Sequence, residues 1–459
     1  MSKISGQIYA GAAKVDITPP CGTIINGDFL PMYARFIHDF LYVRVLALSN
    51  HKQHFVFAVV DNMALDRSLI DEAKDCINKL TGLKPGQVMI SATHAHSCGS
   101  VVETGTCSVD LAYRSLLPDK IAKAVEFAFN NLQPAKIAWG NTDVPKHVSC
   151  RRWYMKPGFA TINPFGGSDK VWMNPPCGSE FLDRPVSPTD PQVSYLAVKS
   201  LTDKWISLLS NYSTHYVADI PADTISADYF GQMDIQLAKK LKSGKSFVGI
   251  MSNGTSGDVN TFDFMQKKDY PTAHFKKSEL IAKDITDAIV LSLQKVSWQS
   301  NPVFKTAVKE TLISTRKPSA KLIAKSKELV TNTDYNSLNT TDKGSDTFAR
   351  LYALEIIKLN HYREDKLYVP LQAIRIGDGI IGTLPGEFFS ETGLRLKEQA
   401  GSKYYFSISL ANAMIGYVPP SPQFALGGYE TWVCFGSYAD KNAEKKISKA
   451  LIELIYSVQ

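Results

Sequence analysis

Apolar and polar positions alternate along this chain with two periods, one typical of strands and the other of helices. The run His54 to Val60 is almost continuously apolar and predicts a buried strand, whereas Leu69 to Leu80 repeats apolar residues at helical spacing. Further strands are predicted at Tyr42 to Leu48, Gln87 to Ser91, Val193 to Val198, Ile206 to Tyr212, Ser246 to Met251, Leu367 to Ile376, Ile380 to Leu384 and Tyr405 to Leu410. Further helices are predicted at Leu116 to Asn130, Phe230 to Leu241, Ala273 to Lys295, Ser319 to Val330, Thr347 to Leu359 and Lys441 to Val458. This alternation predicts an α/β fold with mixed β-sheets and surrounding helices.

One segment, residues 147–191, follows neither period. Prolines interrupt it throughout, at Pro157, Pro164, Pro175, Pro176, Pro185, Pro188 and Pro191. Proline removes a backbone donor, so the segment is predicted to be a long ordered loop that crosses the surface. No repeat or internal linker is evident elsewhere, and residues 1–459 are therefore predicted to form one large domain.

Composition changes this picture little. Of the 459 residues, 44% are hydrophobic and 21% are charged, which is ordinary for a globular protein, and the net charge of +7 is mild for this length. No aromatic-plus-basic module appears, so no nucleic-acid partner is expected. The seven scattered cysteines indicate reduced thiols. No apolar run is long enough to span a membrane and no signal peptide is visible, which predicts a cytoplasmic protein unless a leader was trimmed.

Polar side chains follow five of the predicted strands, where α/β proteins place their ligands. These residues are His94 and His96, His215, Asp258, Glu387 and Tyr417. We therefore expect an active site at the C-terminal ends of the strands.

His94 and His96 are two residues apart, so an extended backbone would direct both imidazoles to one face. Such a pair can also be merely hydrogen-bonded. Together with His215 and Glu387, however, it makes a set of histidines and a carboxylate that suits Zn²⁺ with an open position for water. Carboxylate and phenolate oxygens would also suit iron or manganese.

An ordered series of short motifs resembles the neutral (alkaline non-lysosomal) ceramidase family. The series runs through Val15-Asp16-Ile17-Thr18-Pro19, Thr93-His94-Ala95-His96-Ser97, Ser213-Thr214-His215, Ser226-Ala227-Asp228, Gly257-Asp258-Val259-Asn260, Pro385-Gly386-Glu387, Tyr417 and Tyr429-Glu430. It extends from Ala10 to beyond Tyr429, which covers nearly the whole chain.

The resemblance implies roles for individual residues. Zinc would be bound by His94, His215, Glu387 and Tyr417. The reacting carbonyl would be lined by His96, Tyr429 and Arg151, with the adjacent Arg152 as the alternative to Arg151. Asp258 would act at the site or, alternatively, orient a ligand histidine from behind.

Three departures from the ceramidase pattern concern the substrate. Asn260 stands where ceramidases have serine, Val418 to Pro422 replaces their tyrosine-rich lid, and no residues remain for their C-terminal β-sandwich domain. We therefore predict a zinc-dependent hydrolase of an amide bond in an N-acyl substrate, which includes ceramide-like lipids. The alternatives are a zinc hydrolase of a small soluble amide or ester, and a silent binding homologue. A homo-oligomer is compatible with each of these readings.

Overall fold

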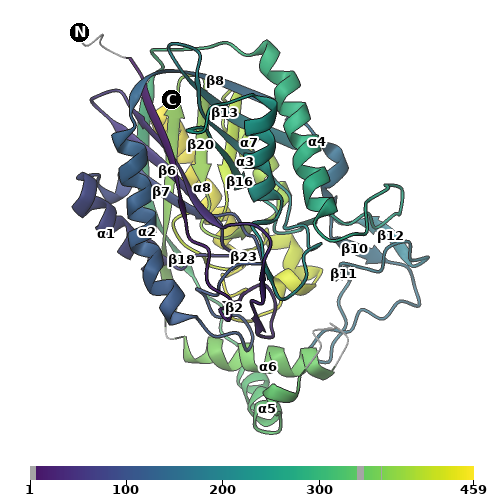
Figure 1. Ribbon diagram of the computed structural model, residues 1–459. Helices are drawn as coiled ribbons and strands as arrows, with labels where there is room; N and C mark the ends of the chain where they lie inside the picture. The colour runs from purple at the N-terminus through teal and green to yellow at the C-terminus, as the bar shows by residue number, and fades with distance from the viewer. Residues whose placement is uncertain (1–6, 339–345, 363) are drawn as a thin grey trace.

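Two β-sheets form the centre of the molecule in the computed structural model, which describes residues 7–338, 346–362 and 364–459 (Figure 1). The larger sheet has the strand order β16 (Val248–Asn253), β14 (Trp205–Tyr212), β13 (Gln192–Ser200), β8 (Gln133–Asp143), β1 (Tyr9–Asp16), β5 (Tyr42–Ser49), β6 (His54–Val60) and β7 (Val88–Ala92). The smaller sheet has the order β18 (Phe304–Ser314), β19 (Lys366–Ile376), β20 (Gly379–Thr383) and β22 (Tyr404–Ile408). Parallel pairs occur at β6–β7, β14–β16 and β20–β22, and the other neighbours in both sheets are antiparallel.

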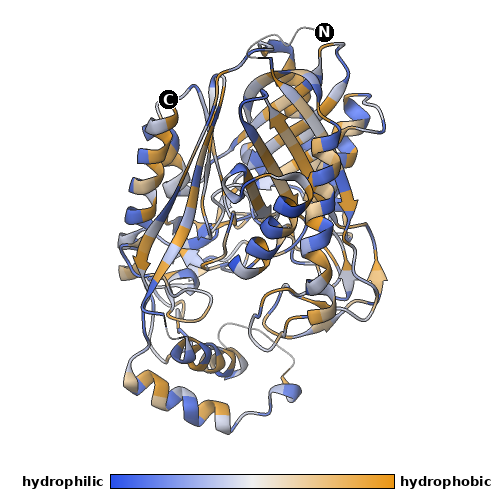
Figure 2. Cartoon of the chain, turned by 90° about the vertical axis from the view of Figure 1, so that its left-hand side faces the viewer, coloured by the Kyte–Doolittle hydropathy of each residue, from blue (hydrophilic) through white to orange (hydrophobic). Residues whose placement is uncertain are grey.

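Helices cover the outer faces of both sheets, so the molecule has four layers (Figure 2). On the large sheet lie α1 (Arg67–Thr81), α2 (Leu111–Asn130), α3 (Asp228–Lys240) and α4 (Lys276–Ser292). On the small sheet lie α7 (Ser390–Gln399) and α8 (Ala443–Val458). The predicted mixed α/β fold is thus confirmed.

Strand β6 shows why its sequence lacks the usual alternation. Val56, Ala58 and Val60 pack against the helical layer, whereas Phe55 and Phe57 pack between the two sheets. Because successive side chains of a strand point to opposite faces, a strand buried on both faces reads as one continuous apolar run.

Capping residues set helix starts that the apolar period alone misplaces. Helix α2 begins at Leu111, five residues before the predicted start, because the Asp110 carboxylate accepts the Tyr113 N–H at 3.0 Å. This bond satisfies one of the donors left open at a helix N-terminus. Pro118 lies inside the helix, at its eighth residue.

The segment 147–191 is a long loop that also contains a small sheet. Strands β11 (Val171–Met173), β10 (Arg152–Met155) and β12 (Leu182–Pro185) pair in that order, and β9 (Ser149–Cys150) pairs with β17 (Val259–Asn260). These strands are only two to four residues long, so the segment contains short ladders within the predicted long ordered loop. Tertiary packing around Trp153 and Phe264 supplies the stabilisation that the short strands lack alone.

A helical hairpin, α5 (Ala320–Thr331) and α6 (Asp346–His361), is inserted between β18 and β19 and extends below the sheets in Figure 1. Helix α6 packs Phe348 and Tyr352 against Trp432 and Cys434. The remaining short paired strands are β2 (Ile24–Ile25) with β3 (Met32–Tyr33), β4 (Phe36–Ile37) with β15 (Thr224–Ile225), and β21 (Glu387–Phe388) with β23 (Tyr417–Val418).

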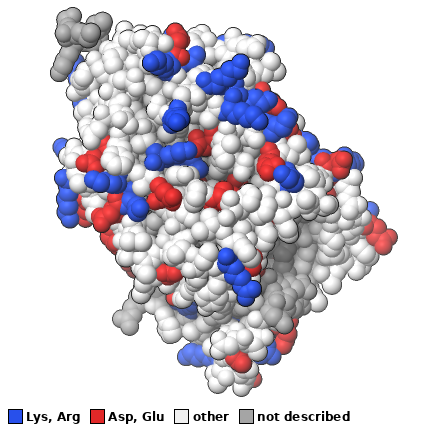
Figure 3. Space-filling model, in the orientation of Figure 1, with Lys and Arg blue, Asp and Glu red and all other residues white. Residues whose placement is uncertain are grey.

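Lys and Arg are interspersed with Asp and Glu on the face shown in Figure 3. Among the described helices, none combines the length and apolar character that crossing a membrane requires.

Candidate metal centre and cavity

Two of the three clustered histidines follow β7. The chain turns sharply there, because His94 adopts a left-handed backbone conformation (φ 75°) that few non-glycine residues accept. Its N–H donates to the Asn62 carbonyl at 2.9 Å. Since strain of this kind persists only where the surroundings enforce it, the turn indicates a functional position.

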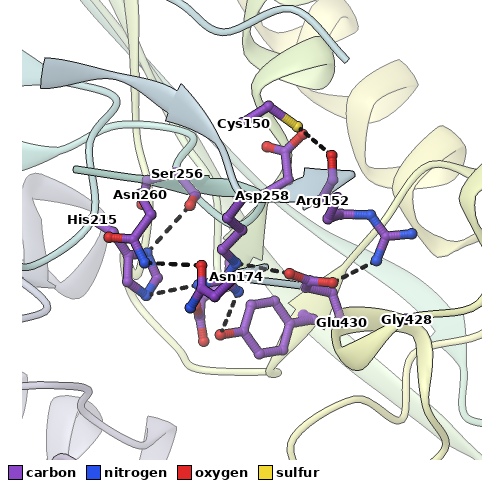
Figure 4. Close-up of polar contacts among 12 residues, drawn as sticks. Cys150, Arg152, Asn174, His215, Ser256, Asp258, Asn260, Gly428 and Glu430 are labelled. Carbon is purple, nitrogen blue, oxygen red and sulfur yellow. Dashed lines mark hydrogen bonds and ion pairs between the residues drawn. The ribbon is translucent and has the colours of Figure 1, made fainter. Parts of the chain in front are cut away.

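Each histidine of the cluster is oriented by a backbone carbonyl. The Nδ1 atoms of His94, His96 and His215 lie 2.8, 2.8 and 3.2 Å from the carbonyl oxygens of Met63, Gly27 and Ser256. A carbonyl oxygen only accepts, so each Nδ1 is the donor and each Nε2 of the neutral ring carries a lone pair. Figure 4 shows the His215–Ser256 bond.

The three Nε2 atoms converge. His94 Nε2 lies 3.3 Å from both His215 Nε2 and His96 Nε2, and all three histidines fit within a metal-binding separation. Burial, together with neighbouring positive groups, lowers the pKa of His96 and His215 well below its usual value. The imidazoles of His96 and His215 are therefore neutral near pH 7, which is the form that binds metals.

Glu387 completes this arrangement from β21. Its Oε2 atom lies 3.4 Å from His94 Nε2 and, within the described residues, receives no hydrogen bond although it is buried. A buried carboxylate oxygen facing imidazole lone pairs is unfavourable without a cation between them. The donor set thus fits a bound metal ion.

Tyr417 and Arg151 lie beside the cluster. Tyr417 pairs directly with Glu387 across β21–β23, and its hydroxyl oxygen accepts from Arg151 Nη2 at 3.1 Å. Arg151 Nη1 also lies 3.2 Å from His215 Nε2. Tyr429 stands next to Tyr417, with the ring centroids 5.6 Å apart.

The two adjacent arginines differ in what they contact. Arg151 lines the cavity, whereas Arg152 is fully buried and donates to the Gly427 carbonyl. Glu430 joins them, accepting from Arg151 Nε at 2.7 Å with one oxygen and from Arg152 with the other (Figure 4). Burial alone would raise the pKa of Glu430, but both guanidiniums outweigh burial and lower it.

Asp258 and Asn260 differ in whether they line the cavity. The Asp258 carboxylate accepts from Ser187 Oγ at 2.6 Å and the Ser390 N–H at 2.7 Å, and it does not line the cavity. Asn260 lines the cavity and donates to Asn174 Oδ1 at 3.2 Å (Figure 4). Asp258 thus ties together segments that carry the site.

A cavity of about 640 Å³ extends from the histidines to helix α6. Its lining includes every predicted site residue except Asp258, together with Phe29, Tyr216, Phe348, Tyr352 and Glu355. Tyr216 stacks on His96 with centroids 3.6 Å apart, which fixes the imidazole plane.

Sequence reasoning missed the roles of Glu430, Tyr216 and Glu355. Glu430 belongs to the motif Tyr429-Glu430. The need of two adjacent arginines for a buried carboxylate could have indicated its role. Nothing local to Glu355 or Tyr216 indicated a cavity.

No protein-family model and no curated protein matches this sequence. Among solved structures, neutral ceramidase from Pseudomonas aeruginosa matches with a TM-score of 0.72 at 14% identity, over 98% of this chain and 74% of that one. A ceramidase complexed with C2 matches with a TM-score of 0.71 at 14% identity, over 98% and 75% of the two chains. At this identity the likeness concerns the fold, and it confirms the resemblance predicted from the motifs. The chain therefore has a neutral-ceramidase fold.

Proposed function

We propose that this protein is a zinc-dependent amidohydrolase that cleaves the amide bond of an N-acyl substrate. One observation carries the proposal: three imidazole nitrogens and a buried carboxylate oxygen, which receives no hydrogen bond from the described residues, line one cavity together with a guanidinium and two phenols. The ceramidase structures that share the fold support amide hydrolysis as the reaction class.

His94, His215 and Glu387 would bind the metal, with Tyr417 as the fourth protein ligand. Donor separations of 3.3 and 3.4 Å are those expected between tetrahedral ligands with bonds of about 2.0 Å. Burial and the Glu387 carboxylate raise the pKa of Tyr417 well above its usual value, and the Arg151 guanidinium, which donates to the phenol oxygen, opposes this shift. Arg151 would thus support the phenolate together with the charge of the metal. Zn²⁺ in such a site supplies Lewis acidity and an activated water near neutral pH.

The residues beside the histidines would act on the substrate carbonyl. Arg151 and Tyr429 bring hydrogen-bond donors to the place where negative charge develops on the carbonyl oxygen. Removal from bulk water raises the pKa of Tyr429 well above its usual value, so its hydroxyl keeps its proton. His96 carries a lone pair at Nε2 and can hold a proton there before it passes to the leaving amine.

The substrate pocket suits N-acyl compounds other than long-chain ceramide. Asn260 stands where ceramidases have a serine, and its amide donates to Asn174 at the cavity wall. This larger side chain would restrict which substrates fit. The segment from Val418 to Pro422 follows the ligand Tyr417 directly. We expect smaller N-acyl amides to be cleaved faster than long-chain ceramide.

The test is metal analysis of purified protein combined with hydrolysis of a short-chain N-acyl amide and of long-chain ceramide, with and without a chelator. About one zinc per chain and chelator-sensitive amine release are expected. Amide hydrolysis that persists in metal-free protein would contradict the metal role. Zinc binding without cleavage of any amide would leave ester hydrolysis or simple binding as the activity of this cavity.

A further inference from the structure

The far end of the cavity contains a buried acidic residue that the proposed chemistry does not use. Glu355 lies on the inner face of α6, three residues after Tyr352, and its side chain is only 5% exposed. It lines the same cavity as the histidines. Buried glutamates are rare unless they are paired or functional.

Aromatic rings connect the two ends. Tyr429 lies 5.6 Å from Tyr417 on the metal side and 6.5 Å from Tyr352 on the α6 side, measured between ring centroids. Phe29 packs on the same tyrosines, 6.4 Å from Tyr429 and 5.8 Å from Tyr352. A substrate positioned for cleavage would therefore run along an apolar wall toward Glu355.

Glu355 is held in place by one hydrogen bond and lies at a greater distance from one lysine. Its Oε1 atom accepts the Gly105 N–H at 3.1 Å and lies 3.8 Å from Lys358 Nζ. Lys358 is also 3.8 Å from Glu103, so one lysine is shared between two carboxylates. Burial raises the pKa of Glu355 to about 7, despite Lys358.

The charged residues that line the cavity are mostly acidic. The carboxylates that line the cavity are those of Asp28, Asp66, Glu103, Glu355 and Glu387. Among the described lining residues, Arg151 is the only lysine or arginine, and Glu430 already holds it. Even with a divalent metal at the histidines and with Lys358 between Glu103 and Glu355, carboxylates would outnumber the cationic charges at this lining, which favours a cationic ligand.

We propose that Glu355 is a specificity-determining residue that binds a protonated amine carried by the amide substrate. The inference rests on the proposed function for the cleavage site itself. An ammonium group would donate to the carboxylate at the end of the aromatic wall, forming a charge-assisted hydrogen bond. An alkyl chain ending there would bring no donor to the buried carboxylate, which would keep only the Gly105 N–H and the more distant Lys358, so simple lipids are disfavoured.

The experiment compares matched probe pairs. One pair is a medium-chain N-acyl amide and its analogue with a terminal amine on the acyl chain. The second pair carries the terminal amine on the amine side. In whichever pair places the ammonium group at Glu355, kcat/KM should favour the aminated probe by about 10–100-fold.

Variants assign that preference to the residue. Glu355→Leu should abolish the preference, and Glu355→Gln, which keeps the shape and an acceptor for Gly105, should remove most of it while the protein stays folded. Glu444→Gln is the matched control, because Glu444 is an equally buried glutamate outside the cavity and bonded to Thr392. It should leave the preference unchanged.

Several results would overturn the inference. Equal kcat/KM within both pairs would refute the role of Glu355. An unaltered preference in Glu355→Gln would refute it too. Neither result would contradict amide hydrolysis. If no probe is cleaved, the proposed function fails. Calorimetric binding of the same probes then tests whether Glu355 binds the amine. Tighter binding of an aminated probe that Glu355→Gln weakens would support it, and equal binding of both members of each pair would refute it.

Discussion

The two ends of the cavity are built by different means. At the histidine end, side chains come from the turns after β7 and β14, and backbone carbonyls fix the three imidazoles. At the α6 end, an inserted helix supplies the lining, and aromatic packing of Phe348 and Tyr352 holds it in place.

Under the proposed function, this difference separates the residues that would cleave the amide from those that would select it. Groups that are fixed by backbone carbonyls in the turns after strands of the fold cannot shift without disturbing those strands. A helix on an insertion can change its side chains at little cost to the rest of the fold. Amide cleavage should therefore depend on the first end, and the choice of amide on the second.

Removing the proposed metal ligand His94 should have the largest effect. His94→Ala takes away the nitrogen that lies within 3.4 Å of three other donors, so zinc should be lost and activity should fall by more than about 10³-fold. Elemental analysis and kcat measured on the same sample test this. Zinc content equal to that of the unaltered protein would remove His94 from the ligand set.

Glu430→Ala should destabilise the histidine end by about 3–5 kcal/mol, because it leaves two buried guanidiniums without their shared carboxylate. Denaturant unfolding monitored by circular dichroism measures the change. Glu355→Gln, at the other end, should cost much less, since the amide keeps an acceptor for Gly105. Comparable losses in both variants would contradict the contrast between the two ends.

His96→Ala should keep its zinc and lose turnover by about 10²–10³-fold, as expected for removal of one group that acts in the transition state. The comparison with His94→Ala is the point of the experiment. If both variants lose zinc, His96 belongs to the ligand set as well.

The pH dependence of stability should report on the α6 end with the smallest effect. The pKa of Glu355 is about 7 in the folded chain against 4.5 in the reference state, so between these values the native state retains a proton that the unfolded state has lost. Its contribution to stability therefore decreases as pH rises from 4.5 to 7 and is level above that. Relative to Glu355→Gln, the unaltered protein should lose on the order of 2 kcal/mol across this range. Parallel stability curves for the two proteins would show that the carboxyl titrates normally.

The same contrast explains what could be predicted from the sequence. β5, β6 and α1 carry strong local patterns, and their predicted positions are correct to within two residues. β1 and β18 went unpredicted because one is rich in small residues and the other is largely exposed and polar. α7 also went unpredicted, being short and mostly polar.

The candidate site divides in the same way. His94, His215 and Glu387 follow strands, and the rule that ligands gather at strand ends was enough to associate them. Helix α6 was predicted from its period, but periodicity carries no information on where a helix docks. The exposure of Glu355 to the cavity depends on that docking.

The paired arginines have a consequence for insertions and deletions. Arg151 N–H donates to the Asp258 carbonyl, and Cys150 pairs with Val259, so the neighbouring strand sets which guanidinium meets the cavity. Successive residues of an extended chain point to opposite sides. A one-residue insertion or deletion ahead of Cys150 would exchange the positions of the two guanidiniums, while both arginines and their shared glutamate stay in the sequence. Homologues with a single-residue gap there would thus still show both arginines in an alignment. The arginine that reaches the cavity would, however, come from a different backbone position.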